Sequence, residues 1–132
     1  MIGLDTNILV RLAIEDDPAQ LRRARAFLAA NCSAEEPGFV NRVTLCELVW
    51  VLTSNYGLGR IQIARHLTDL IASTDIVVED GGAVRGAVTR YTSTNIEFAD
   101  LLIAETNLAA GCKATATFDK RAARLDGFTS VP

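Results

Sequence analysis

Short runs of strand-forming residues alternate along this chain with longer segments of helical periodicity, and this alternation constrains the fold more than any other feature. The strand candidates are MIGL at 1–4, FVN at 39–41, DIVVED at 75–80, ATATF at 114–118 and FTSV at 128–131. Single helices or helix pairs separate them, and strands joined by helices form parallel sheets covered on both faces. We therefore predict an α/β fold, a three-layer α/β/α sandwich with a central parallel sheet of about four to five short strands.

Capping residues indicate where several helices begin. Asp17 is followed by Pro18 and, three residues on, by Gln20, which is the pattern of a helix N-terminus with a capping box. Gly111 is well placed directly after the end of a helix. The other expected caps are Thr6 or Asn7 for a helix to about Ile14, Asp80 for a glycine-containing helix, and Thr94 with Glu97 as a second capping box.

The length of 132 residues predicts a single domain spanning 1–132. No apolar run approaches the roughly 18 residues of a membrane helix, and the N-terminus lacks the basic region of a signal peptide. The three cysteines form no C-x-x-C motif, which fits a reduced compartment, so we expect a soluble cytoplasmic protein with no membrane partner. The net charge of −3 argues against a histone-like or repressor-like binder, although it does not exclude nucleic acid.

Four acidic residues occupy positions where a carboxylate is unusual. Asp5 ends the first strand candidate and Asp119 ends ATATF, and ligands of parallel α/β sheets bind at the carboxyl ends of the strands. Glu47 has mainly apolar neighbours one helical turn away, where an unpaired carboxylate is costly. Asp100 lies near the start of its helix, where the helix dipole favours negative charge.

Each of these acids also has a purely structural interpretation. Asp5 can be a helix cap, and Asp119 an ordinary turn residue. Glu47 can lie on a thin solvent-exposed stripe, and Asp100 can simply complement the helix dipole. The functional interpretation rests on topology, because two strand ends and two helices can converge on one pocket.

Clustered carboxylates have a definite chemical use. Without a cation they repel one another, and at least one takes up a proton. Mg²⁺ and Mn²⁺ prefer oxygen ligands, whereas the sequence has no histidine or cysteine spacing suited to Zn²⁺. Carboxylate-bound Mg²⁺ can activate water and stabilise charge on a phosphoryl oxygen, so the natural substrate class is a phosphodiester.

The residues together resemble the PIN-domain ribonucleases and, among them, the VapC-type toxins of toxin–antitoxin pairs. The resemblance spans the chain and rests on LDTN at the N-terminus, Glu47 in TLCELVWVL, Asp100 in FADLLIAETNLAAGC, and ATFD ending in Asp119. It implies a Mg²⁺- or Mn²⁺-dependent endoribonuclease whose acidic pocket contains Asp5, Glu47, Asp100 and Asp119. It also implies that Asp5 and Asp100 are the most direct metal ligands.

The resemblance also implies supporting residues and partners. Thr6, Asn7 and Thr117 are expected to give polar support around the metal. Arg11, Lys120 and Arg121 are hypothetical RNA phosphate contacts, and solvated surface charges are an equally good interpretation of them. The expected partners are an RNA substrate, a second copy in a homodimer, and a small cognate antitoxin whose C-terminal segment covers the active site.

Two other functions remain open from the sequence. One is a non-catalytic PIN-like module that only binds RNA or protein. The other is a different metal-dependent phosphoryl-transfer enzyme, such as a receiver domain or a haloacid-dehalogenase-like phosphatase. The phosphatase requires a second Asp two residues after the first, and that position is Asn7 here.

Overall fold

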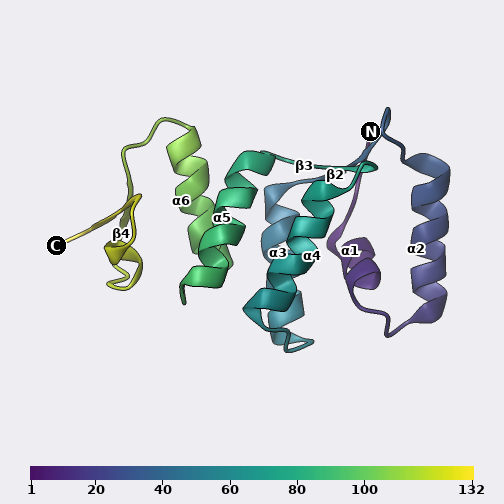
Figure 1. Ribbon diagram of the computed structural model, residues 1–132, viewed down its shortest axis with the longest axis horizontal. Coiled ribbons are helices and arrows are strands. Elements are labelled where there is room, and N and C mark those ends of the chain that lie inside the picture. Colours follow the sequence, from purple (N-terminus) through teal and green to yellow (C-terminus); the bar gives the residue numbers. More distant parts are fainter. The chain divides into compact units, whose positions relative to one another are not determined.

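The chain folds into two compact units. The computed structural model describes residues 1–132, and its units are Met1–Gly81 and Gly82–Pro132 (Figure 1). No helix in either unit is both long enough and apolar enough to cross a membrane. The expected single domain over 1–132 stays a prediction.

The first unit contains a three-stranded parallel sheet with the order β1-β2-β3. Ile2 pairs with Gly38, and Gly38 pairs with Ile76, so the strands start in register. Helices precede or follow each strand, as the alternating pattern predicted. The elements are β1 (Ile2–Gly3), α1 (Thr6–Ala13), α2 (Pro18–Asn31), β2 (Gly38–Val40), α3 (Arg42–Ser54), α4 (Arg60–Ala72) and β3 (Ile76–Val78).

Aliphatic side chains from the central strand and the helix pair form the core of this unit. Val40 of β2 is fully buried. The inner face of α4 contains Ile63 and Leu67, which have no exposed surface. α1 packs against both α2 and α3, which fixes the direction in which α1 leaves the end of β1.

The second unit pairs two helices with a small parallel sheet. Thr115 pairs with Phe128 and Thr117 with Ser130. The ring of Tyr91 meets that of Phe98 edge to face, with centroids 5.8 Å apart. The elements are α5 (Gly81–Ser93), α6 (Phe98–Ala109), β4 (Thr115–Thr117), the 3₁₀ helix η1 (Ala122–Arg124) and β5 (Phe128–Ser130).

The predicted fold class is confirmed as α/β with short parallel strands. All five strand candidates form strands, each of two or three residues. They are distributed over a three-stranded and a two-stranded sheet. Strand pairing joins segments far apart in the chain, so the number of sheets is decided by tertiary packing rather than by the local pattern.

The cap predicted at Asp17 is confirmed, and at the start of α1 the structure selects Asp5, one of the two alternatives that the sequence offered. Asp17 Oδ1 accepts a hydrogen bond from the backbone N–H of Gln20 at 3.0 Å, as a cap should. The N-cap of α1 is Asp5 itself, whose Oδ1 accepts from the N–H of Thr6 at 2.8 Å. The prediction of Thr6 or Asn7 as the cap was therefore wrong and the interpretation of Asp5 as a helix cap is confirmed, because the chain turns into the helix immediately after the strand segment.

The expected capping box from Thr94 to Glu97 is also wrong. α6 begins at Phe98 with Glu97 as its N-cap residue. Thr94 instead closes the preceding helix, since its hydroxyl donates to the carbonyl of Arg90 at 2.7 Å. Gly111 does follow the end of α6 with a φ of 96°, the left-handed conformation expected of a residue just past a helix.

Candidate active site

Two of the four candidate acids line one pocket in the second unit. Asp100 lies in the first turn of α6, and Asp119 follows the end of β4 by two residues. The pocket has a volume of about 250 Å³, and Thr117 is also part of its wall. The strand-end argument from the sequence therefore identified a carboxylate that does face a cavity.

The electrostatics of this pocket disfavour a second negative charge. Burial raises the pKa of Asp100 above its ordinary value, and the charges of Asp119 and Glu97 raise it further. No hydrogen bond or ion pair involves the carboxylate of Asp100. No neighbouring group therefore compensates the charge of Asp100 when it is ionised, and a cation in the pocket would neutralise it.

Asp119 is held in place by the turn that follows β4. Its Oδ1 accepts from the backbone N–H of Arg121 at 2.8 Å and more weakly from that of Ala122 at 3.4 Å. The N–H of Asp119 in turn donates to the hydroxyl of Thr117 at 3.0 Å. Oδ1 of Asp119 therefore stabilises the turn, as the structural interpretation of this residue predicted. Oδ2 has no hydrogen-bond partner and stays available to a ligand.

The other two candidate acids belong to the first unit. Asp5 is an exposed residue at the junction of β1 and α1, where one of its oxygens caps the helix. Glu47 is exposed on α3, and its carboxylate makes no hydrogen bond or ion pair. The structure of the first unit therefore supports the alternative interpretation of Glu47, in which it lies on a solvent-exposed stripe of its helix. The expectation that all four acids share a pocket stays a prediction.

The supporting polar residues occupy different environments. Thr6 is an interior residue with 3% of its surface exposed, next to the cap formed by Asp5. Asn7 is exposed and lines a pocket between α1 and α2. Thr117 lies in the pocket of Asp100 and Asp119, where its hydroxyl supports the turn.

The three basic candidates differ in how strongly they are already paired. Arg11 Nη1 donates to Asp16 Oδ1 at 2.7 Å. Arg121 lies 3.9 Å from the carboxylate of Asp119, a loose and exposed contact. Lys120 is exposed and has no partner. Lys120 and Arg121 directly follow Asp119, so they place positive charge close to the second-unit acids.

The donors around Asp100 and Asp119 suit a hard divalent cation. Both groups offer carboxylate oxygens, and Thr117 adds a hydroxyl, with no sulfur or imidazole in the pocket wall. This is the ligand chemistry of Mg²⁺ or Mn²⁺ and not that of Zn²⁺. Within neither unit do three or more acidic, histidine or cysteine side chains gather as a complete metal site. Mg²⁺ commonly uses one or two carboxylates and keeps several waters, so the pair is a sufficient protein contribution.

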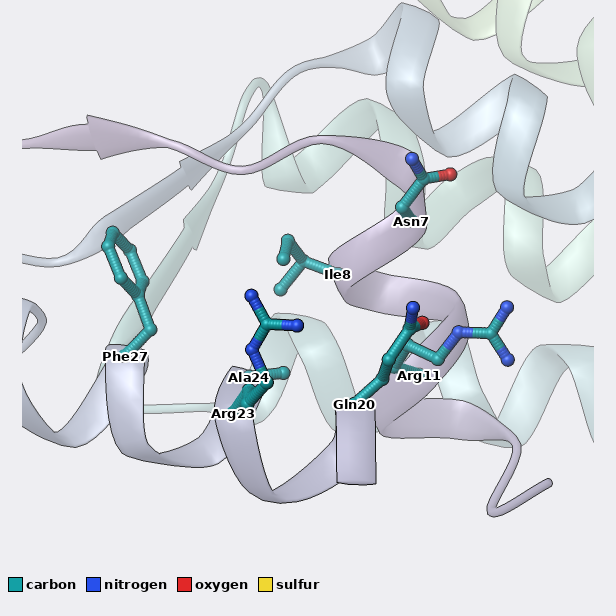
Figure 2. Close-up of a pocket in the computed structure, with 7 residues that line it drawn as sticks. All are labelled: Asn7, Ile8, Arg11, Gln20, Arg23, Ala24 and Phe27. Atoms are coloured by element: carbon teal, nitrogen blue, oxygen red, sulfur yellow. The ribbon is translucent and has the colours of Figure 1, made fainter. Parts of the chain in front are cut away.

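A further pocket, between α1 and α2, contains residues that were not among the sequence candidates. Arg23 and Phe27 of α2 face Ile8 of α1 across it (Figure 2). The sequence does hold a signal for it, since the helix PAQLRRARAFLAAN contains three arginines and no acidic residue. That charge pattern becomes meaningful only when the helix face is known.

A parallel α/β structure in which one carboxylate near a strand end meets another from a helix offers oxygen ligands suited to a hard divalent cation. The model of the PIN domain family matches residues 2–128 of the chain. The protein therefore belongs to the PIN-domain family, whose members are generally metal-dependent nucleases. No curated protein and no solved structure matches it significantly.

Proposed function

We propose that this protein is a Mg²⁺- or Mn²⁺-dependent endoribonuclease and acts as the VapC-type toxin of a toxin–antitoxin pair. Membership of the PIN-domain family supports nuclease chemistry in general. The observation that carries the proposal is the Asp100–Asp119 pair, which gathers two carboxylates in one pocket and raises the pKa of Asp100. An acid pair of this kind is stable at neutral pH when a cation neutralises it.

The proposed catalytic and metal-binding residues are Asp5, Glu47, Asp100 and Asp119. Asp5 and Asp100 are the more direct ligands, while Glu47 and Asp119 hold a second ion or position the attacking water. These residues would hold a divalent ion, which when bound would supply Lewis-acid stabilisation of the phosphodiester and activate a water molecule. Thr117 keeps Asp119 oriented through the hydrogen bond from the Asp119 N–H.

Cleavage of purified RNA tests the enzymatic part of this proposal. The wild-type protein should cut RNA with Mg²⁺ or Mn²⁺ and stop when EDTA is added. Asp100→Asn and Asp119→Asn should each reduce cleavage by at least about a hundredfold, since each removes a charge that would hold the ion. Asp126→Asn is the matched control, because Asp126 is an exposed acid of the same unit outside the pocket.

Expression in growing cells tests the toxin part. Induction of the wild-type protein should stop growth, and mapping of RNA 5′ ends should reveal discrete cuts. Asp5→Asn and Glu47→Gln should relieve the arrest, whereas Asp69→Asn, at an exposed acid of the same unit, should not. Metal-dependent cleavage in vitro without growth arrest would retain the nuclease and refute the toxin role.

The proposed partners follow from the same function. They are an RNA substrate, a small cognate antitoxin that covers the active site, and a second copy of the chain in a cytoplasmic homodimer. The Asp100–Asp119 pocket carries negative charge, so a basic side chain of the antitoxin would compensate it. Co-expression with a small protein encoded beside this gene should restore growth and suppress cleavage.

A further inference from the structure

The pocket between α1 and α2 is large enough for a nucleotide. Its volume is about 600 Å³, within the range of small-ligand sites. Both helices belong to the first unit and pack directly against each other. Figure 2 shows the side chain of Arg23 rising from α2 toward Ile8, with the ring of Phe27 on one side and the side chain of Gln20 on the other.

The charge of this pocket favours an anionic ligand. α2 carries three arginines and no acidic residue, although the whole chain has a net charge of −3. Arg25 pairs with Glu15, whereas Arg23 has no hydrogen-bond or ion-pair partner. A guanidinium without a partner, in the wall of a pocket, is suited to a phosphate group because its fork matches two phosphate oxygens.

Arg11 also contributes to the wall of this pocket, and Figure 2 shows its guanidinium directed away from Arg23, beyond the side chain of Gln20. Its Nε is buried and has no hydrogen-bond partner, and no other buried side-chain nitrogen or oxygen in the structure is left unpaired in this way. Its Nη1 is already bonded to Asp16, so the guanidinium is fixed in position. Arg11 therefore adds positive charge at one end of the pocket, whereas Arg23 is the guanidinium that stays available to a ligand.

The pocket wall also contains an aromatic ring, that of Phe27. Phe27 is 43% exposed, so part of its surface is open to a ligand. Half-exposed rings beside arginines are the groups on which single-stranded nucleic acids stack their bases. The amide side chains of Asn7 and Gln20 add donors and acceptors that can meet a base edge or a sugar hydroxyl.

We propose that the α1–α2 pocket is a nucleotide subsite that binds one residue of a single-stranded RNA, with Arg23 on the phosphate and Phe27 stacked on the base. The proposal rests on the proposed ribonuclease function for the identity of the ligand. Its position supports that link, because Asn7 of the pocket lies in the first turn of α1 and Asp5 caps the same turn. RNA bound in the pocket is thereby held close along α1 to a proposed catalytic acid.

Direct binding of RNA in EDTA tests the subsite without requiring cleavage. The probe is a fluorescein-labelled single-stranded RNA of about ten nucleotides, followed by fluorescence anisotropy. Arg23→Ala and Phe27→Ala should each weaken binding by about tenfold. Arg22→Ala is the matched control, since Arg22 is an exposed arginine of the same helix outside the pocket, and its effect should stay within about twofold.

Two further variants separate stacking and charge from a general loss of structure. Phe27→Tyr should restore most of the affinity, because it keeps an aromatic face. Arg23→Ala should also reduce the salt dependence of binding by about one counterion, whereas Phe27→Ala should leave that dependence unchanged. Because Arg23 and Phe27 are exposed, their variants should have melting temperatures close to that of the wild type.

The outcomes distinguish this subsite from the proposed nuclease function. Wild-type RNA affinity in both Arg23→Ala and Phe27→Ala overturns the subsite, even where the protein still cleaves RNA. Pocket-dependent RNA binding without metal-dependent cleavage supports the subsite and overturns the nuclease. Binding of an acidic peptide that depends on Arg23 and Phe27, with RNA binding unaffected, identifies a protein partner as the occupant and refutes the RNA proposal.

Discussion

Asp119 raises the pKa of Asp100 across the pocket that the two carboxylates share. Burial of Asp100 acts in the same direction and is the larger cause. The pair therefore makes the second unit less stable when both groups are ionised, and the same arrangement makes it attractive to a cation. The unfavourable charge of Asp100 in this pocket has consequences for stability that can be measured.

Removing the charge of Asp100 should stabilise the protein in the absence of divalent cations. We expect Asp100→Asn to increase the free energy of unfolding at pH 7 by about 0.5–1 kcal/mol, a modest figure because the carboxyl is only partly buried. Thermal and urea unfolding in EDTA would measure it. Destabilisation by Asp100→Asn at neutral pH would contradict the repulsion seen in the pocket.

The stability that Asp100→Asn gains over the wild type should depend on pH, and the direction of this dependence follows from the raised pKa. The pKa of Asp100 is raised in the folded state, so the wild type is destabilised only where this group is ionised. The difference between wild type and Asp100→Asn should be full above the raised pKa and disappear as pH falls from there to the ordinary value of 3.8. Unfolding of both proteins across this range, in EDTA, checks the prediction.

Divalent cations should make the wild type more stable than Asp100→Asn, the reverse of the order expected in EDTA. Mg²⁺ or Mn²⁺ at a hundredfold excess over its dissociation constant should stabilise the wild type by about 2.7 kcal/mol, because only the folded state presents the acid pair. Asp100→Asn should lose most of that increment, while Asp126→Asn should retain it. Melting temperatures recorded with and without cation would show this, and an equal shift in all three proteins would indicate nonspecific binding instead.

Glu79 should contribute to stability through its contact with Arg42. Glu79 accepts hydrogen bonds from the backbone N–H and the Nε of Arg42, at 3.0 and 3.2 Å, and these bonds lower the pKa of Glu79. Because the folded pKa is depressed, the contribution is present above the ordinary value of 4.5 and disappears as pH falls through the lowered pKa. Glu79→Gln should cost about 0.5–1 kcal/mol at pH 7, since the pair is partly exposed, and urea unfolding of both proteins would measure it.

Gly38 should resist any side chain. A Cβ there would lie 2.8 Å from Cδ1 of Leu4 and 3.2 Å from Sγ of Cys32, both of which are buried. We expect Gly38→Ala to destabilise the protein by about 1–3 kcal/mol through overpacking. Gly3→Ala is the control, because a Cβ added at Gly3 would have no other atom within 4 Å. Equal stability of the two variants in urea unfolding would show that the core around β2 can rearrange to accommodate an added methyl group.

Local patterns were sufficient to predict the elements of this fold. The five short strands and the cap at Asp17 both follow from residues close together in the sequence. The errors lie at junctions: Asp5 caps α1 in place of Thr6 or Asn7, and Thr94 closes α5 instead of opening α6. At both positions several polar residues can cap, and the path of the neighbouring chain selects among them.

The candidate acids were identified from the sequence, but their environments were not. Asp119 was placed at a strand end by the pattern, yet its pairing with Asp100 depends on how α6 packs beside β4. Glu47 has apolar neighbours in the sequence and is nevertheless exposed on α3. Burial is a property of the packed structure, so sequence neighbours predict it only where the whole helix face is apolar.

The sequence by itself determined the α/β class, the order of strands and helices, and the four acids that suggest metal-dependent phosphodiester chemistry, because these depend on periodicity and residue type. Tertiary structure alone decided that the strands form two sheets, that Asp100 shares a pocket with Asp119, and that Arg23 and Phe27 face a cavity between α1 and α2. Each of these relations joins residues from different elements. Only packing, which balances burial of apolar surface against the cost of burying charge, brings such residues together.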